Sequence, residues 1–202
     1  RMIGLFRNKY PDVSVQLQVH STRRTGWSVA NGQIDLGIIG GQLPGDLENL
    51  LQVIPYATDE LALVLPIKHQ LANKKELLKE DLYKLNFVTL DSQSTTRKVV
   101  DKLLKDSGLD IQRLKIEMEL NSLEAIKNAV QSGLGAAFLP VVSIERELAG
   151  GTIHKAYVAD LEVKRELKLI TNPSRYTSRA SEVFKKNILP QFASLESPLR
   201  QI

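Results

Sequence analysis

The chain has 202 residues, of which 43% are hydrophobic and 25% are charged, and it contains no cysteine. This length is sufficient for one large or two small domains with a real hydrophobic core. The absence of cysteine excludes disulfides and thiolate catalysis, and it is compatible with a reducing cytoplasm. The formal net charge is +4, but the basic residues are scattered, so we do not expect this segment to contact DNA. No apolar run has the length of a membrane span or the layout of a signal peptide.

The chain begins with alternating helical and extended patterns. Apolar residues at helical spacing indicate helices, and valine and leucine alternating with serine and glutamine indicate a strand. Up to residue 90, the predicted elements are a helix over 1–10, a strand over 13–19, a helix from Ser21 to Gly32, strands over 34–39 and 61–65, a helix near 79–85 and a strand over 86–90.

The rest of the chain continues this alternation. The predicted elements are a helix over 95–107, a strand over 116–120, a helix after Asn121, a strand over 135–139, a helix over 140–149, strands over 153–158 and 166–170, and a helix over 179–189.

The segment from Asn121 to Pro140 carries the clearest local signals. Asn121 can cap a helix, and Glu124 follows at the position of a capping-box partner. Gly133 suits the left-handed position after the helix end, and residues 135–139 are apolar enough for an interior strand. The segment therefore predicts one helix and one strand of an α/β fold whose helix starts point out of the carboxyl edge of the sheet, where such folds bind ligands.

Strands alternate with helices throughout, which predicts an α/β fold with mostly parallel sheets. Two similar modules occupy residues 1–65 and roughly 66–165, and the last strand leads back toward the first module. The chain would cross between modules near Pro66 and near Thr171. This organisation is typical of a hinged, two-lobed binding protein.

Small polar residues follow each predicted strand that leads into a helix. They are Ser21 and Thr22, then Ser94 to Arg97, then Asn121. Exposed N–H groups and the positive end of a helix dipole attract carboxylate or phosphate, and Arg97 would add a clamp if it turned inward. The alternative is that these residues only cap their helices.

No catalytic or metal-binding set accompanies these polar residues. The chain has three histidines, His20, His69 and His154, and no pair of them has metal-ligand spacing. The glycines of residues 37–41 lack the spacing of a dinucleotide fingerprint or a P-loop. The sequence thus offers donors for an anion and nothing to transform it, so we expect neither an enzyme nor a cofactor.

Four stretches together carry a resemblance to a known family: Phe6–Val19, Val29–Gly41, Glu60–Pro66 and Val130–Pro140. In this order and spacing, the chain resembles the effector-binding domain of LysR-type transcriptional regulators. It is most similar to the branch that controls carbon-fixation and inorganic-carbon-uptake genes in cyanobacteria and other autotrophs.

This resemblance implies a type 2 periplasmic-binding-protein-like fold: two Rossmann-like subdomains joined by two crossing strands, with an effector between them. Subdomain RD-I would comprise residues 1–66 and 171–202, and RD-II residues 67–170. The N-terminal winged helix-turn-helix and the first strand of RD-I would be absent from this chain. The expected effector-binding residues are Thr22, Ser94, Thr95, Thr96, Arg97, Ser21, Asn121 and Thr171.

The resemblance also implies a function. The expected effector is a small anionic carbon metabolite: 2-oxoglutarate, 2-phosphoglycolate or a sugar bisphosphate. The expected protein is a cytoplasmic homodimer or homotetramer that binds DNA through its N-terminal domain and makes no membrane contact. Residues 1–10 either form part of the dimer surface or cover the sheet. The rival interpretations are a stand-alone solute-binding protein of a transporter and an enzyme on the same scaffold.

Overall fold

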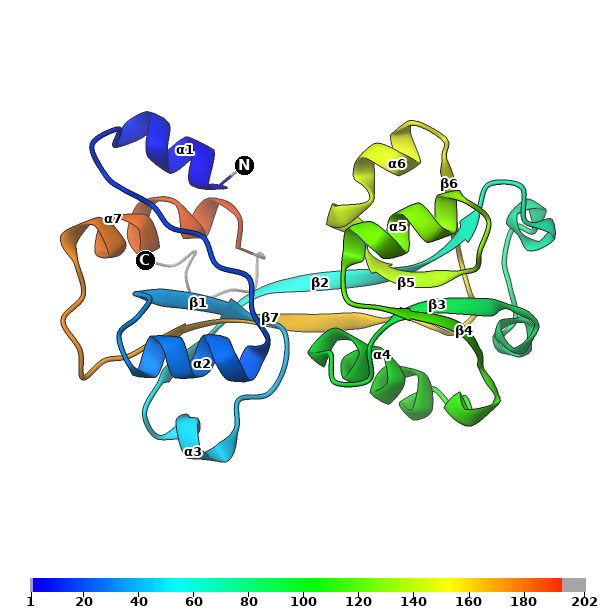
Figure 1. Cartoon of the computed structure of the whole chain (residues 1–202), viewed down its shortest axis with the longest axis horizontal. Helices are drawn as coiled ribbons and strands as arrows, with labels where there is room; N and C mark the ends of the chain where they lie inside the picture. Colours follow the sequence, from blue (N-terminus) through cyan, green and yellow to red (C-terminus); the bar gives the residue numbers. More distant parts are fainter. Residues whose placement is uncertain (1, 194–202) are drawn as a thin grey trace. The chain divides into compact units, whose positions relative to one another are not determined.

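The computed structural model describes residues 2–193, which form two compact units. Unit 1 contains residues 2–58 and 166–193, and unit 2 contains residues 59–165. Two strands, β2 (Gln52–Pro66) and β7 (Lys164–Thr171), contribute residues to both units (Figure 1). The chain changes unit at 58/59 and 165/166, inside these strands, whereas the sequence places the boundaries at their far ends, at 66/67 and 170/171.

Unit 1 has helices on both sides of its strands. Figure 1 shows α1 and α7 on one side and α2 and α3 on the other. β1 runs antiparallel to β7. Besides its parts of β2 and β7, the unit consists of α1 (Met2–Lys9), α2 (Thr22–Ala30), β1 (Leu36–Ile39), α3 (Gly45–Glu48), α7 (Arg179–Asn187) and the 3-10 helix η5 (Leu189–Gln191).

Successive residues of β7 point into the two cores of unit 1, as the pleat of a strand requires. Ile170 packs with Val29 of α2 and Leu47 of α3. Leu169 packs on the other face with Tyr56 and Leu189. The helices on each side therefore cover an apolar face of the same strand.

Helix α1 is part of the second of these cores. Phe6 is buried and meets Phe184 of α7 edge to face, with ring centroids 5.0 Å apart. Met2 packs against the same cluster of apolar residues. Of the two interpretations of residues 1–10, the contacts within unit 1 support the one in which Met2 and Phe6 cover the sheet.

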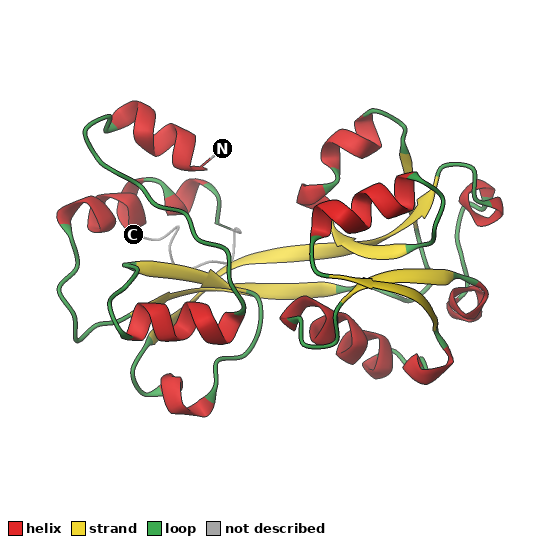
Figure 2. Cartoon of the chain, viewed as in Figure 1, coloured by secondary structure: helices red, strands yellow, loops and turns green. Residues whose placement is uncertain are grey.

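Unit 2 also places helices on both sides of its strands (Figure 2), with α5 and α6 on one side and α4 on the other. β3 pairs with β4 in parallel, and β2 pairs antiparallel with β5 and with β6. Besides its parts of β2 and β7, the unit consists of η1 (Gln70–Asn73), η2 (Lys79–Lys84), β3 (Asn86–Leu90), α4 (Thr95–Asp106), η3 (Ile111–Arg113), β4 (Lys115–Leu120), α5 (Leu123–Gln131), β5 (Ala137–Pro140), η4 (Val141–Ser143), α6 (Glu145–Ala149) and β6 (Ile153–Ala156).

Strand β2 divides the core of unit 2 into two clusters by the same alternation. Leu61, Leu63 and Leu65 belong to the cluster that includes α4. Ala62 and Val64 belong to the cluster that includes α5. The sequence predicts the strand over residues 61–65, and the structure shows that both faces of this apolar run are covered.

The segment 121–140 folds as predicted except at its cap, and Glu124 is not a capping-box partner because it pairs with Lys127 at 2.8 Å. Ser122, and not Asn121, caps α5, because its hydroxyl accepts a hydrogen bond from the N–H of Ala125 at 3.2 Å. Gly133 has φ +84°, as the left-handed position after the helix requires. At Gly135 a Cβ would lie 2.6 Å from the carbonyl oxygen of Asn86, so only glycine fits this close approach to β3.

Two expectations about strands are wrong. Residues 13–19 do not form a strand: they belong to no sheet, and Leu17 and Val19 are 72% and 86% exposed. Their period-two pattern indicates an extended chain but does not supply the hydrogen-bonded neighbour that a strand needs. Parallel pairing also fails for three pairs, β1–β7, β2–β5 and β2–β6, which are antiparallel. The order of helices and strands does not fix the direction in which β2 and β7 run past their neighbours.

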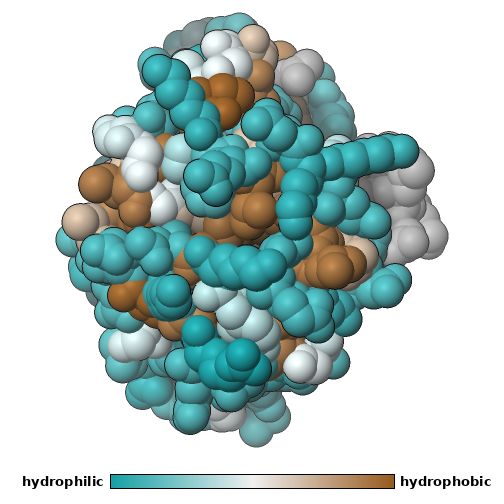
Figure 3. All heavy atoms as spheres, turned by 90° about the vertical axis from the view of Figure 1, so that its right-hand side faces the viewer, coloured by the Kyte–Doolittle hydropathy of each residue, from teal (hydrophilic) through white to brown (hydrophobic). Residues whose placement is uncertain are grey.

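Hydrophilic side chains cover most of the face drawn in Figure 3, and hydrophobic side chains form smaller patches between them. Within residues 2–193, no helix combines the length and the hydrophobicity that crossing a bilayer requires.

Candidate functional site

The turns after β3 and β4 lie at one edge of unit 2. The strands are parallel, and the N–H of Asp91 donates to the carbonyl oxygen of Leu120 at 3.1 Å, which joins their ends. The start of α4 and Asn121 therefore share the carboxyl edge of this sheet. This is the edge at which α/β folds bind small molecules.

The first turn of α4 has donors that the described protein does not use. Ser94 occupies the cap position, but its hydroxyl makes no cap hydrogen bond. The first hydrogen bond of the helix runs from the N–H of Lys98 to the carbonyl oxygen of Ser94 at 3.0 Å. The N–H groups of residues 95–97 precede it and have no acceptor within residues 2–193. Three N–H groups at the positive end of a helix dipole can together hold an anion.

A buried ion pair supports this turn from the side. Arg165 of β7 donates through Nε to Asp59 of β2 at 2.8 Å, and a second nitrogen of its guanidinium lies 2.7 Å from the same carboxylate oxygen. The remaining terminal nitrogen donates to the hydroxyl oxygen of Thr96 at 2.7 Å. All three residues belong to unit 2, so the pair fixes the start of α4 against the two long strands of that unit.

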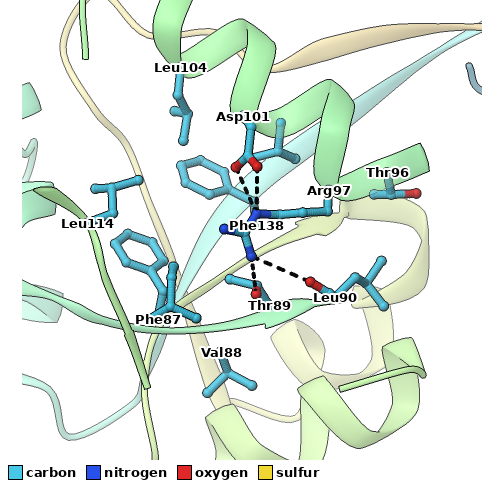
Figure 4. A pocket seen from close by; sticks show the side chains of 12 residues that line it. Phe87, Val88, Thr89, Leu90, Thr96, Arg97, Asp101, Leu104, Leu114 and Phe138 are labelled. Carbon is cyan, nitrogen blue, oxygen red and sulfur yellow. Dashed lines mark hydrogen bonds and ion pairs between the residues drawn. The ribbon is translucent and has the colours of Figure 1, made fainter. Parts of the chain in front are cut away.

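Arg97 faces another direction. Its guanidinium is paired with Asp101 at 2.8 Å and also donates to the Thr89 hydroxyl and to the carbonyl oxygen of Leu90. In Figure 4 the Arg97 side chain runs between helix and strand while Thr96 points away from it. The Arg97 side chain therefore does not turn inward to form a clamp at the start of α4. Only the backbone N–H of Arg97 belongs to the free donors of this turn.

The crevice that holds the Arg97 side chain is mostly apolar. It is small, about 30 Å³, which is room for roughly one or two water molecules. Apolar side chains such as Phe87, Leu104 and Phe138 line it (Figure 4). The guanidinium that enters this crevice has its hydrogen-bond partners within unit 2. The crevice itself is too small to hold an effector.

The other expected site residues fall into two groups. Asn121, at the edge of unit 2, is exposed, and its side chain makes no hydrogen bond within the described residues. In unit 1, Ser21 caps α2 by accepting from the N–H of Arg24 at 3.3 Å, and Thr22 is buried behind it. The hydroxyl of Thr171, at the end of β7, lies 3.5 Å from the side-chain oxygen of Gln52. The structure thus groups Ser94, Thr95 and Thr96 in one turn and Ser21 with Thr22 in another.

The sequence does not reveal Arg165 and Asp59 as parts of this site. They lie 106 residues apart, and Arg165 lies 69 residues from Thr96. A charged residue in each of two strands gives no local signal of pairing. Only the topology, which brings β2 and β7 together, could have indicated it.

The described residues contain no cluster of three or more histidine, cysteine, aspartate or glutamate side chains that could hold a metal ion. Two of the histidines have local partners. His69 accepts from the N–H of Leu71 at 3.2 Å, and His20 lies 3.2 Å from the side-chain oxygen of Gln18.

Two α/β units that share two long strands define a type 2 periplasmic-binding-protein-like fold. The family model described as the LysR substrate binding domain matches residues 1–193. The chain belongs to this family.

Relatives with a higher sequence identity indicate which members of the family this chain is similar to. A probable RuBisCO transcriptional regulator of Synechocystis sp. is 61% identical over 194 residues, which are 96% of this chain and 56% of the relative. The one of Cyanophora paradoxa is 53% identical over 198 residues, which are 98% of this chain and 61% of the relative. The chain thus spans less than two thirds of the length of the curated relatives it matches.

Solved structures share the fold at low identity. The regulatory domain of Synechocystis CcmR in complex with 2-PG has a TM-score of 0.82 at 23% identity, covering 96% of this chain and 90% of that one. The effector binding domain of QuiR in complex with shikimate has a TM-score of 0.77 at 20% identity, covering 95% and 88%.

Proposed function

We propose that this chain is the effector-binding part of a LysR-type regulator of carbon-fixation genes. We further propose that its effector is a small anionic carbon metabolite, with 2-phosphoglycolate first among the candidates and 2-oxoglutarate and a sugar bisphosphate next. The relatives named as RuBisCO regulators, at up to 61% identity, support the class of regulator. A structural neighbour in complex with 2-PG supports the first candidate.

The free donors at the start of α4 are the single observation that carries the choice of an anion. The hydroxyl of Ser94 and the N–H groups of residues 95–97 have no acceptor in the described protein. A phosphate or carboxylate group supplies only acceptors and would fill all of these positions at once. We propose Ser94, Thr95 and Thr96 as direct contacts, with Asn121 at the same edge. The contributions of Ser21, Thr22 and Thr171 stay a prediction.

The wider role concerns the full-length protein. In this proposal a homodimer or homotetramer binds DNA through an N-terminal domain in the cytoplasm. The effector acts because it binds two states of that oligomer with different affinity, which is the condition for any ligand-driven switch. The names of the relatives favour such a regulator over a stand-alone solute-binding protein of a transporter and over an enzyme.

Calorimetric titration of the chain with 2-phosphoglycolate, 2-oxoglutarate and a sugar bisphosphate tests the proposal. We expect at least one of them to bind, and Thr95→Val to weaken that binding about 10-fold, because a hydrogen bond to a charged group contributes roughly 1.5–3 kcal/mol. Ser107→Ala is the matched control, since this hydroxyl donates to the Leu103 carbonyl at the opposite end of α4. The proposal fails if none of the three anions binds, or if both variants weaken binding equally.

A further inference from the structure

Arg165 and Asp59 form a buried ion pair beside the start of α4, and this pair caps none of the N–H groups of the helix. Asp59 is 7% exposed, and the Arg165 side chain 14%. Three of the five N–H donors of the guanidinium have partners: two point to Asp59 and one to the Thr96 hydroxyl. Because the guanidinium is planar and Asp59 holds one side of it, the nitrogen that contacts Thr96 has little freedom to move away.

This contact determines what the Thr96 hydroxyl can do. A guanidinium donates hydrogen bonds and cannot accept them, so the Thr96 oxygen must be the acceptor of the 2.7 Å bond. The proton of the hydroxyl is then left to donate elsewhere. No acceptor for it is present among residues 2–193.

We infer that Arg165, held in place by Asp59, is a specificity-determining positioning residue of the effector site. It forces the Thr96 hydroxyl to present its proton at the start of α4, where the neighbouring free groups are also donors. A turn in which the free backbone N–H groups and the Thr96 hydroxyl all donate favours an oxyanion over a ligand group that can only donate. This inference rests on the proposed function and adds residues that the sequence does not single out.

The competing explanation is purely structural, namely that the bond only ties β7 to α4. The two explanations differ in what they predict for binding. A structural tie would change the unfolding temperature and leave the affinity of the folded protein for an anion unchanged. A positioning role changes the affinity, depends on the hydroxyl of Thr96, and couples Thr96 to Arg165.

The test uses the whole chain, with 2-phosphoglycolate, 2-oxoglutarate and a sugar bisphosphate as calorimetric probes and thermal unfolding as the fold control. Thr96→Val removes the hydroxyl and nearly keeps the shape, and Thr96→Ser keeps the hydroxyl. Arg165→Lys keeps the positive charge beside Asp59, but a single ammonium on a flexible stem does not reproduce the fork that joins Asp59 to Thr96.

We expect the bound anion to lose about 10-fold in affinity with Thr96→Val and with Arg165→Lys, and less than about 2-fold with Thr96→Ser. In the Arg165→Lys background, Thr96→Val should add less than about 2-fold, because the two residues act as one unit. If the unchanged chain binds an anion and both single variants bind it equally well, the inference is overturned and the proposed function stands. If the unchanged chain binds none of the probes, both are overturned.

Discussion

Within residues 2–193, a serine occupies the cap position of four α-helices, and one of these serines makes no cap hydrogen bond. Ser21, Ser122 and Ser178 accept a hydrogen bond from the N–H three residues on, at 3.3, 3.2 and 3.1 Å, at the starts of α2, α5 and α7. Ser94 holds the same position at the start of α4 and makes no such bond. The residue type is the same, so the local sequence does not account for the difference.

The comparison shows how one residue type can serve stability at one helix and recognition at another. At α2, α5 and α7 the cap satisfies a donor of the helix and so stabilises the fold. At α4 the equivalent donors stay free, and the Arg165–Asp59 pair holds the turn by Thr96 instead. Support from outside the helix therefore holds the first turn in place without satisfying its N–H donors, and these donors stay available for a ligand.

The largest expected effect comes from removing the support of α4. Asp59→Ala leaves the Arg165 charge buried without its partner, and breaking a buried pair in this way costs about 3–5 kcal/mol of unfolding free energy. Urea unfolding followed by circular dichroism measures it. Glu60→Ala is the control, because Glu60 pairs with Lys155 on a more exposed part of β2 and should cost less than about 1 kcal/mol. Equal costs for the two variants would show that the pair at α4 has no special role.

A second prediction concerns the start of the 3-10 helix η2, where the Asp81 carboxylate accepts hydrogen bonds. Asp81 accepts from Lys84 at 2.7 Å and from the N–H of Leu78 at 3.1 Å, and these bonds lower its pKa from 3.8 to about 2, with Lys74 adding to the effect. Because the folded pKa lies below the unfolded one, the stabilisation is fully present above about pH 4. It is lost as the pH falls toward 2.

Asp81→Asn should therefore lower the unfolding free energy by about 1–2 kcal/mol at pH 7, allowing for the exposed lysine partners. The difference from the unchanged chain should shrink as the pH falls from 4 to 2. Urea unfolding at a series of pH values checks this. A difference that stays constant down to pH 2 would contradict the assignment.

The smallest expected effect is the change in unfolding free energy when the serines at the starts of α5 and α4 are each replaced by alanine. Ser122→Ala should cost about 1 kcal/mol of unfolding free energy, because it removes a cap hydrogen bond. Ser94→Ala should cost less than about 0.5 kcal/mol, because no cap hydrogen bond is lost. The affinity for an anion should change in the opposite order. Equal stability losses would mean that Ser94 also acts as an ordinary cap.

Much of the fold is predictable because its signals are local. Residues 86–90 form a predicted strand, and residues 95–106 a predicted helix, because period, caps and glycine stops act within a few residues. Residues 13–19 show the limit, since their alternation is real but they pair with no strand among residues 2–193. Local patterns do not predict strand direction for the same reason, because the direction depends on neighbours far along the chain.

The site divides in the same way. The polar turn at Ser94 to Thr96 is visible in the sequence, because it follows a strand and opens a helix. The sequence pattern favours Asn121 as the cap of α5, one residue before the actual cap Ser122, because pattern alone cannot separate adjacent residues of similar capping ability. Arg97 was expected to face the turn, but Asp101, one helical turn later, takes its guanidinium.

The most direct measurement follows the backbone N–H signals of the ¹⁵N-labelled chain while 2-phosphoglycolate is added. The amides of residues 95–97, which lack acceptors, should shift most, and that of Ser181, which already donates to a serine hydroxyl at the start of α7, should stay in place. Saturating shifts of this kind would support anion binding at the start of α4. If the anion binds while residues 95–97 keep their signals unchanged, the account of this helix start is wrong.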